Sequence, residues 1–279
     1  MENQKPKTKN APSPTAWTIA GSDSGGGAGI QADLKVMGAF GVHGCSVITA
    51  LTAQSTLGIQ SSEPVSESML RAQLQALEND LPPVAIKTGM LGSSKTCEVL
   101  SEVFQPLEAP IICDPVLKST SGTTLLDPET LELLKAGIFP KVGVLTPNLP
   151  EVGKILGTEN FPSLEEAAER LLGLGVGSVL IKGGHAPGDE CTDYWTDGKQ
   201  SMWLSSPRIE TKDTHGTGCI LSSAIASAIA LGQEIPEAII TAKTFLNQCL
   251  KSPANIGAGP GPALIAPFRN DPQDRPTIR

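Results

Sequence analysis

Short apolar runs alternate with longer helix-like patterns from Trp17 almost to the end of the chain. Between the runs lie amphipathic stretches such as "SESMLRAQLQALEND", where Met69, Leu70, Leu74 and Leu77 recur at helical spacing. A repeated strand–helix order requires a mainly parallel sheet that is covered on both faces. With no internal repeat or flexible linker, the sequence predicts one α/β domain with strands at 16–20, 45–51, 84–89, 110–114, 142–146 and 178–182.

Polar or glycine-rich groups follow five of these predicted strands. Because ligands of open parallel sheets bind beyond the carboxyl ends of the strands, these groups are expected to converge on one crevice. Polar turn formers are common in loops, so one such group alone would be weak evidence for a site. The five groups are Asp23, Gly89 with Met90, Asp114, Asn148 with Glu151, and Lys182 with the two glycines after it.

The first glycine cluster, "GSDSGGGAG" at 21–29, follows a strand and precedes a helical pattern, as many phosphate loops do. It matches neither nucleotide fingerprint. From Gly25 the sixth position is Ile30, which breaks the dinucleotide pattern, and Gly27 stands where a P-loop requires lysine. The sequence therefore gives no support for a nucleotide site at this turn.

The second glycine cluster opens the stretch "DTHGTGCILSSAIASAIALG" at 213–232. Leu221, Ile225 and Ile229 recur every four positions, which predicts a buried helix that ends at Gly232. The first amides of a helix lack internal partners and lie at the positive end of its dipole, so they form an anion site. The glycine turn at 216–218 is thus the expected phosphate site.

Cys219 lies at the mouth of this anion site, where a helix N-terminus is expected to lower the pKa of the thiol. Two other interpretations stay open. Cys219 could be a small core residue, as most unpaired cysteines are, or it could form a nucleophile pair with His215, although four residues across a glycine turn do not fix that geometry.

Composition restricts the class of protein. A net charge of −8 and 4% aromatic residues oppose a nucleic-acid-binding surface. No apolar run approaches the roughly 20 residues of a membrane span, so a soluble protein is expected. Six scattered cysteines without a CxxC pair suit a reducing cytoplasm. Residues 1–15 lack a secretory apolar segment and are interpreted as a disordered tail.

The motifs together resemble the ribokinase superfamily, and within it the bacterial hydroxymethylpyrimidine/phosphomethylpyrimidine kinases of thiamine biosynthesis. The similarity spans about 16–262, in the motifs "TIAGSDSGGGAGIQADLK", "SVITALTAQST", "IKTGML", "DPV", "LTPNLPE", "IKGGH" and "DTHGTGC". It implies a three-layer α/β/α fold in a single kinase domain at 16–268, followed by a C-terminal tail at 269–279. It also implies ATP as donor and two successive transfers, onto the hydroxymethyl group and then onto the monophosphate, with a homodimer as the expected assembly.

The resemblance assigns a pyrimidine pocket and a catalytic end. Gln54 would hydrogen-bond the aminopyrimidine, whose edge presents a donor beside an acceptor that an amide can pair in both directions. The residues expected to line the same pocket are Gly21, Asp23, Met90 and Val116.

At the catalytic end Asp114, Asn148 and Glu151 match the family's magnesium-organising positions, with Asp114 and Glu151 as the metal carboxylates. Lys182 would reach the nucleotide phosphates. The turn formed by Gly216, Thr217 and Gly218 would stabilise the moving phosphoryl group through its amides.

Cys219 replaces the aspartate base of the sugar kinases, which argues against a sugar kinase. The resemblance implies that it acts in the first transfer, where a hydroxyl must lose a proton, more than in the second, where the phosphate monoester is largely ionised already.

The chain departs from the family pattern at a few positions. Gly25 replaces a common serine, His43 lies where an aromatic residue is frequent, and Lys118 could add a phosphate contact. Two rival functions stay open: a pyridoxine or pyridoxal kinase of the same superfamily, and a non-catalytic pyrimidine sensor that kept the fold.

Overall fold

A computed structural model describes residues 13–279 except 119–121, 123–124, 159, 185–187 and 253. The predicted tail at 1–15 therefore falls almost wholly outside the described residues, and β1 begins at Thr15. Within the described residues one ten-stranded sheet runs in the order β10-β9-β8-β7-β6-β5-β4-β1-β2-β3. The strands are β1 Thr15–Asp23, β2 His43–Ser55, β3 Gly58–Pro64, β4 Ala85–Thr88, β5 Ile111–Cys113, β6 Val142–Leu145, β7 Val179–Ile181, β8 Glu190–Thr196, β9 Ser201–Pro207 and β10 Thr277–Ile278.

The six predicted strands correspond to β1, β2, β4, β5, β6 and β7, and these strands pair in parallel. The remaining strands extend both edges as antiparallel additions. β3 pairs with β2, and β8, β9 and β10 follow β7. The prediction of a mainly parallel sheet is confirmed for the centre of the molecule, which carries the carboxyl ends that matter for a ligand.

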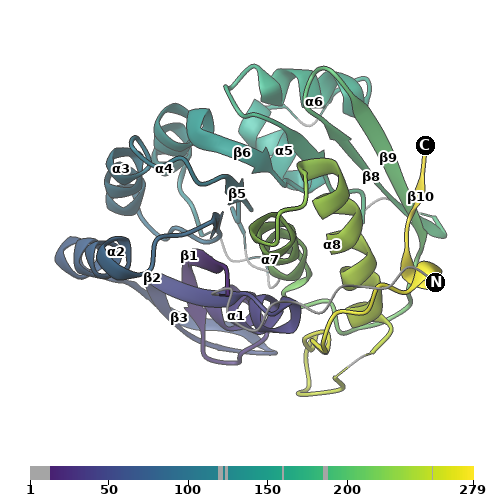
Figure 1. The fold of residues 1–279 in the computed structure, drawn as a ribbon, viewed down its shortest axis with the longest axis horizontal. Coiled ribbons are helices and arrows are strands. Elements are labelled where there is room, and N and C mark those ends of the chain that lie inside the picture. Colours follow the sequence, from purple (N-terminus) through teal and green to yellow (C-terminus); the bar gives the residue numbers. More distant parts are fainter. Residues whose placement is uncertain (1–12, 119–121, 123–124, 159, 185–187, 253) are drawn as a thin grey trace.

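Helices cover the sheet on both faces, which gives the predicted three layers (Figure 1). One face packs its core residues against α2, α3, α5 and α6, and the other against α1, α7 and α8. Successive side chains of β4 point to opposite faces of the sheet, so Ile86 packs in the first core and Ala85 in the second. The helices are α1 Gly29–Phe40, α2 Glu67–Asp80, α3 Ser94–Val103, α4 Pro128–Leu133, η1 Leu134–Ile138, η2 Phe139–Lys141, α5 Leu149–Leu156, α6 Leu164–Leu172, α7 Thr217–Ala230, α8 Ile235–Leu250 and η3 Pro272–Asp274.

The predicted amphipathic helix at 66–80 is α2, but its apolar stripe is narrower than expected. Leu70 and Leu74 are buried and Leu77 packs against the core, whereas Met69 is 55% exposed. The prediction that Met69 belongs to this stripe was wrong, because one residue is about 100° of helix rotation and places Met69 beside the stripe.

The predicted buried helix of the second glycine cluster is α7. Leu221 and Ile225 are buried, Ile229 packs against the same core, and Gly232 adopts a positive φ of 88° just after the helix. Figure 1 shows α7 and α8 side by side in the centre of the view. Because α7 packs against α8, against α1 and against the sheet, it is apolar on nearly all sides.

Residues 269–279, expected as a tail, contain η3 and β10. The backbone of Arg279 exchanges two hydrogen bonds with Trp203 at the edge of the sheet. Just before this segment, the Phe268 ring stacks on Phe40 with their centroids 4.9 Å apart. Among the described helices, none is both long enough and apolar enough to cross a membrane.

Candidate active site

One cavity of about 1020 Å³ lies beyond the carboxyl ends of the central strands. Its volume exceeds that of most small-molecule pockets, so it can hold two ligands side by side. The structure brings every residue that the resemblance assigned to the site to its walls, whereas Gly89 and Gly183 of the predicted strand-end groups do not line it. The predicted residues on these walls are Gly21, Asp23, Gln54, Met90, Asp114, Val116, Asn148, Glu151, Lys182, Gly216, Thr217, Gly218 and Cys219.

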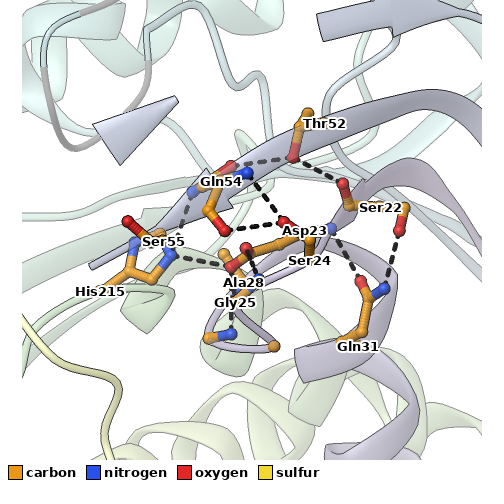
Figure 2. Close-up of polar contacts among 12 residues, drawn as sticks. Ser22, Asp23, Ser24, Gly25, Ala28, Gln31, Thr52, Gln54, Ser55 and His215 are labelled. Atoms are coloured by element: carbon orange, nitrogen blue, oxygen red, sulfur yellow. Dashed lines mark hydrogen bonds and ion pairs between the residues drawn. The ribbon is translucent and has the colours of Figure 1, made fainter. Parts of the chain in front are cut away.

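The first glycine cluster wraps around the carboxylate of Asp23 (Figure 2). Oδ1 accepts the amide of Gly25 at 2.8 Å, and Oδ2 accepts the amides of Gly27 at 3.0 Å and Ala28 at 2.8 Å. Burial opposes ionisation, but hydrogen bonds from His215 and from these amides outweigh it and hold the pKa of Asp23 below its ordinary value. Asp23 is therefore an anion that shapes the loop between β1 and α1.

Gln54 lies near the end of β2, between this loop and the second glycine cluster. Its side-chain Nε2 is 3.2 Å from His215 Nε2, and its Oε1 is 3.3 Å from Thr52 Oγ1. His215 Nε2 is also 2.9 Å from Asp23 Oδ2. The structure thus brings His215, weighed above as a partner of Cys219, into the network of Asp23 and Gln54 (Figure 2).

The two glycine clusters pack backbone against backbone. A Cβ on Gly216, which has a φ of 80°, would lie 2.0 Å from the carbonyl oxygen of Gly27. A Cβ on Gly27 would lie 2.5 Å from Cδ2 of His215. Neither position can carry a side chain, so these glycines are required for the close approach of the two segments.

The second glycine cluster opens α7 as the sequence predicts. Gly216 is the N-cap, and the amides at the start of the helix face the cavity that Thr217 and Gly218 line. Asp114 and Lys182 lie directly beside this turn, since a Cβ on Gly218 would be 3.0 Å from Asp114 Oδ2 and 3.4 Å from Lys182 Nζ. A ligand phosphate here would meet helix amides and a lysine together.

Lys182 forms an ion pair of 2.8 Å with Asp114, and both side chains are largely buried. Burial lowers the pKa of the lysine, but the carboxylates of Asp114 and Glu151 outweigh it and raise that pKa above its ordinary value. Lys182 therefore keeps its positive charge in the cavity.

Asn148 and Glu151 form a capping box at the start of α5. Asn148 Oδ1 accepts the Glu151 amide at 2.9 Å, and Glu151 Oε2 accepts the Asn148 amide at 2.8 Å. Burial and the nearby Asp114 raise the pKa of Glu151 to about 7, against the opposing effect of Lys182 and of backbone amides. Glu151, which the resemblance assigned only to the metal site, therefore also caps the start of α5.

Asp114 and Glu151 are the carboxylates available for Mg²⁺. Within the described ranges no group of three His, Cys, Asp or Glu side chains could hold a metal. Mg²⁺ usually takes one or two carboxylates and completes its shell with water and phosphate oxygens, so this sparse pair fits Mg²⁺ better than a cation that needs a full protein cage.

The thiol of Cys219 differs from the prediction. It lies in the first turn of α7 and accepts the amide of Gly29 from the start of α1, but burial raises its pKa to about 11 even though Lys87 opposes that rise. The expected lowering of the pKa was wrong, because removal of the thiolate from water outweighs the two helix N-termini.

Two of the other lysines that line the cavity are buried, and neither was predicted as a site residue. Lys87 of β4 pairs with Asp33 at 2.8 Å with neither side chain exposed, and Lys243 of α8 pairs with Asp193 at 2.6 Å. The signal in the sequence was a lysine inside an apolar strand, "VAIKTG", since a lysine is seldom buried without a partner.

The fold and the site together define a class of protein. A three-layer α/β/α domain with a glycine turn at a buried helix, beside an aspartate–lysine pair, is that of a ribokinase-like phosphotransferase. The chain belongs to the phosphomethylpyrimidine kinase family, whose model matches residues 23–264. The sequence-based identification of the family and fold is thereby confirmed.

Three relatives show how close the match is. The hydroxymethylpyrimidine/phosphomethylpyrimidine kinase of Streptomyces coelicolor is 43% identical over 89% of this chain and 93% of its own. A phosphomethylpyrimidine kinase structure from Clostridium difficile has a TM-score of 0.74 at 38% identity, covering 84% of this chain and 98% of its own. A pyridoxal kinase structure from Staphylococcus aureus in complex with ADP has a TM-score of 0.87 at 29% identity, covering 96% and 98%.

Proposed function

We propose that this chain transfers the phosphoryl group of ATP first to 4-amino-5-hydroxymethyl-2-methylpyrimidine and then to the resulting monophosphate. The observation that carries the proposal is one cavity whose walls hold Gln54, the α7 turn and Lys182 together. Relatives with this named activity are 39–44% identical to the chain, and an ADP complex of a structural neighbour supports ATP as donor.

The chain's own groups supply binding and charge stabilisation. The amides of the turn at 216–218 hold the moving phosphoryl group, and Lys182 neutralises the charge that develops on it. Asp114 and Glu151 would hold Mg²⁺, which when bound would neutralise phosphate oxygens. Gln54 and the loop around Asp23 orient the ring so that its 5-substituent faces the turn.

The two transfers differ in their need for a base. In the first, the hydroxymethyl oxygen attacks the γ-phosphorus of ATP, the bond from that phosphorus to ADP breaks, and Cys219 as thiolate receives the hydroxyl proton. With a pKa of about 11, only roughly one thiol in a thousand is ionised at pH 8, so the first transfer should accelerate as the pH rises. In the second transfer the acceptor is a phosphate monoester that is largely ionised already, so no base is needed.

The rival within the superfamily is a pyridoxal kinase, which the TM-score of 0.87 to the Staphylococcus aureus enzyme favours. The experiment that separates the two is a product assay with hydroxymethylpyrimidine and pyridoxal as competing acceptors. Detection of the pyrophosphorylated pyrimidine supports the proposal, and exclusive formation of pyridoxal phosphate refutes it. A pyrimidine sensor would bind the ring without consuming ATP.

We also propose a single kinase domain that acts as a homodimer in the cytoplasm. All six cysteines are free thiols, which suits a reducing compartment. Light scattering on the purified full chain measures the assembly directly, and a monomeric mass would refute the dimer.

A further inference from the structure

Three side chains meet above the first glycine cluster, and their hydrogen-bond directions are strongly restricted. His215 Nε2 lies 2.9 Å from Asp23 Oδ2 and 3.2 Å from Gln54 Nε2 (Figure 2). A single ring nitrogen either donates or accepts, so it cannot serve both neighbours in opposite senses.

The Asp23 carboxylate decides the role of that nitrogen. It accepts three backbone amides and is an anion, so it can only accept from His215. Nε2 of His215 therefore carries a hydrogen and has no lone pair left in the ring plane. The atom of Gln54 that faces it must be an acceptor, which is the carbonyl oxygen Oε1 and not the amide nitrogen.

Thr52 leads to the same conclusion from the other side of the amide. Its Oγ1 lies 2.8 Å from the carbonyl oxygen of Ser22, which can only accept, so the single hydroxyl hydrogen of Thr52 goes there. The oxygen of Thr52 is left as an acceptor towards Gln54, at 3.3 Å. The atom of Gln54 that faces Thr52 must then be a donor, which is the amide nitrogen.

Both contacts become attractive after one 180° rotation of the Gln54 amide, which exchanges two nearly isosteric groups, and the one hydrogen of His215 Nε2 is then shared between Asp23 Oδ2 and Gln54 Oε1 as a three-centre bond. We propose that His215 and Thr52 are specificity-determining residues that hold Gln54 with Oε1 on the imidazole and Nε2 on the threonine. One lone pair of Oε1 and one hydrogen of Nε2 then remain for a ligand in the cavity that Gln54 lines.

The next step rests on the proposed function. A Gln54 amide held in this orientation can hydrogen-bond only a ring edge that presents its donor and acceptor in one order. The 5-hydroxymethyl group must face the turn at 216–218, so the ring cannot turn over. A 4-aminopyrimidine offers a donor at position 4 and an acceptor at N3, whereas its 4-oxo analogue offers an acceptor at position 4 and a donor at N3. The locked Gln54 pairs with the first order and opposes the second, and a freely rotating amide would pair with either.

The experiment compares kcat/KM of the first transfer for the 4-amino substrate and for its 4-oxo analogue. Wild type should prefer the 4-amino ring by roughly 10²-fold or more, because buried polar groups that are left mispaired are strongly rejected. H215L and T52V should each reduce this ratio to below about 10-fold, mainly through KM. Q54L should bring the ratio close to one.

Ser24→Ala is the matched control. Among the described residues Ser24 Oγ hydrogen-bonds only the backbone of Gln54, donating to its carbonyl at 2.7 Å and accepting its amide at 2.8 Å, so the ratio should stay within about twofold of wild type. An unchanged ratio in both H215L and T52V, with both variants folded, overturns the proposal. A ratio that is unchanged in Q54L overturns it as well.

A measurement without turnover separates this proposal from the proposed function. In the ¹⁵N-labelled protein, the side-chain NH₂ of Gln54 should show a nuclear Overhauser effect to the Thr52 γ-methyl group, which H215L weakens. If wild type phosphorylates neither pyrimidine, the proposed function fails, and the NMR contact alone decides the orientation. Contact of that NH₂ with the His215 ring protons in its place would overturn the locked orientation.

Discussion

Replacement of Glu151 by glutamine tests the electrostatics of the catalytic end. The folded protein raises the pKa of Glu151 from 4.5 to about 7, so the folded state binds this proton more tightly than the unfolded chain does. The associated stability is fully present below pH 4.5 and is lost as the pH rises through 7. From pH 5 to pH 8 the loss is about 2.5 kcal/mol.

Glutamine is neutral throughout this range and keeps the capping box, whose N3 position accepts Glu or Gln. Between pH 5 and pH 8 the free energy of unfolding of E151Q should therefore rise by about 2.5 kcal/mol relative to that of wild type, which corresponds to roughly 5–10 °C in Tm. E151Q should also lose activity, since it removes one of the two carboxylates that we propose for Mg²⁺.

Urea unfolding of both proteins at the two pH values, in the presence of EDTA, measures this gain. The control is Glu166→Gln, which makes the same change at the third position of another capped helix, where the glutamate is exposed. If the difference in the free energy of unfolding between E151Q and wild type stays constant or shrinks from pH 5 to pH 8, the raised pKa of Glu151 is refuted.

Three further predictions concern the residues around the turn. Cys219→Ala should slow the first transfer by about 10²-fold or more and the second by no more than about threefold. Single-turnover assays measure the rate of each transfer, and equal losses in both would reject Cys219 as the base. Gly218→Ala should lower kcat at least about tenfold, because the added Cβ would lie 3.0 Å from Asp114 Oδ2. Thermal unfolding of this variant should show no loss of stability, since alanine has a higher helix propensity than glycine. Lys87→Met should lower the free energy of unfolding by about 3–5 kcal/mol, because it leaves Asp33 buried without its lysine. Asp33→Asn added to the same chain should restore most of that free energy in urea unfolding. If it restores none, the ion-pair explanation is contradicted.

The central strands could be predicted because burial on both faces leaves a continuous apolar run in the sequence. The edge strands give no such signal. β3, "GIQSSEP", is almost wholly exposed and is held by its backbone pairing with β2, so nothing in its side chains marks it. β10 at Thr277–Ile278 is equally exposed and exists because the edge of β9 is available to it.

The site could be predicted in its membership but not in its internal contacts. Strand ends in a parallel sheet converge by topology, which is why residues as distant as Asp23 and Lys182 line one cavity. The sequence could not show that His215 bonds Asp23 and Gln54, since 192 and 161 residues separate these partners. Nor could it show the burial that sets the pKa of Cys219, because the depth of a thiol depends on how two helices pack.

The charge of the chain raises a question that the site resolves. A protein of net charge −8 should repel the polyanionic nucleotide that its family uses. The walls of the cavity nevertheless carry five lysines, and three of them are each paired with a buried aspartate: Lys87 with Asp33, Lys182 with Asp114, and Lys243 with Asp193.

For Lys87 and Lys182 burial alone would lower the pKa, but their aspartates outweigh it and raise both pKa values above the ordinary value, so these two lysines stay charged. Each lysine still has donors beyond the one its aspartate takes. A phosphate that enters therefore meets charged lysines and helix amides, and the Mg²⁺ ion that we propose for Asp114 and Glu151 would add to this attraction. The attraction is local and desolvated, so it outweighs the screened repulsion of carboxylates spread over the surface.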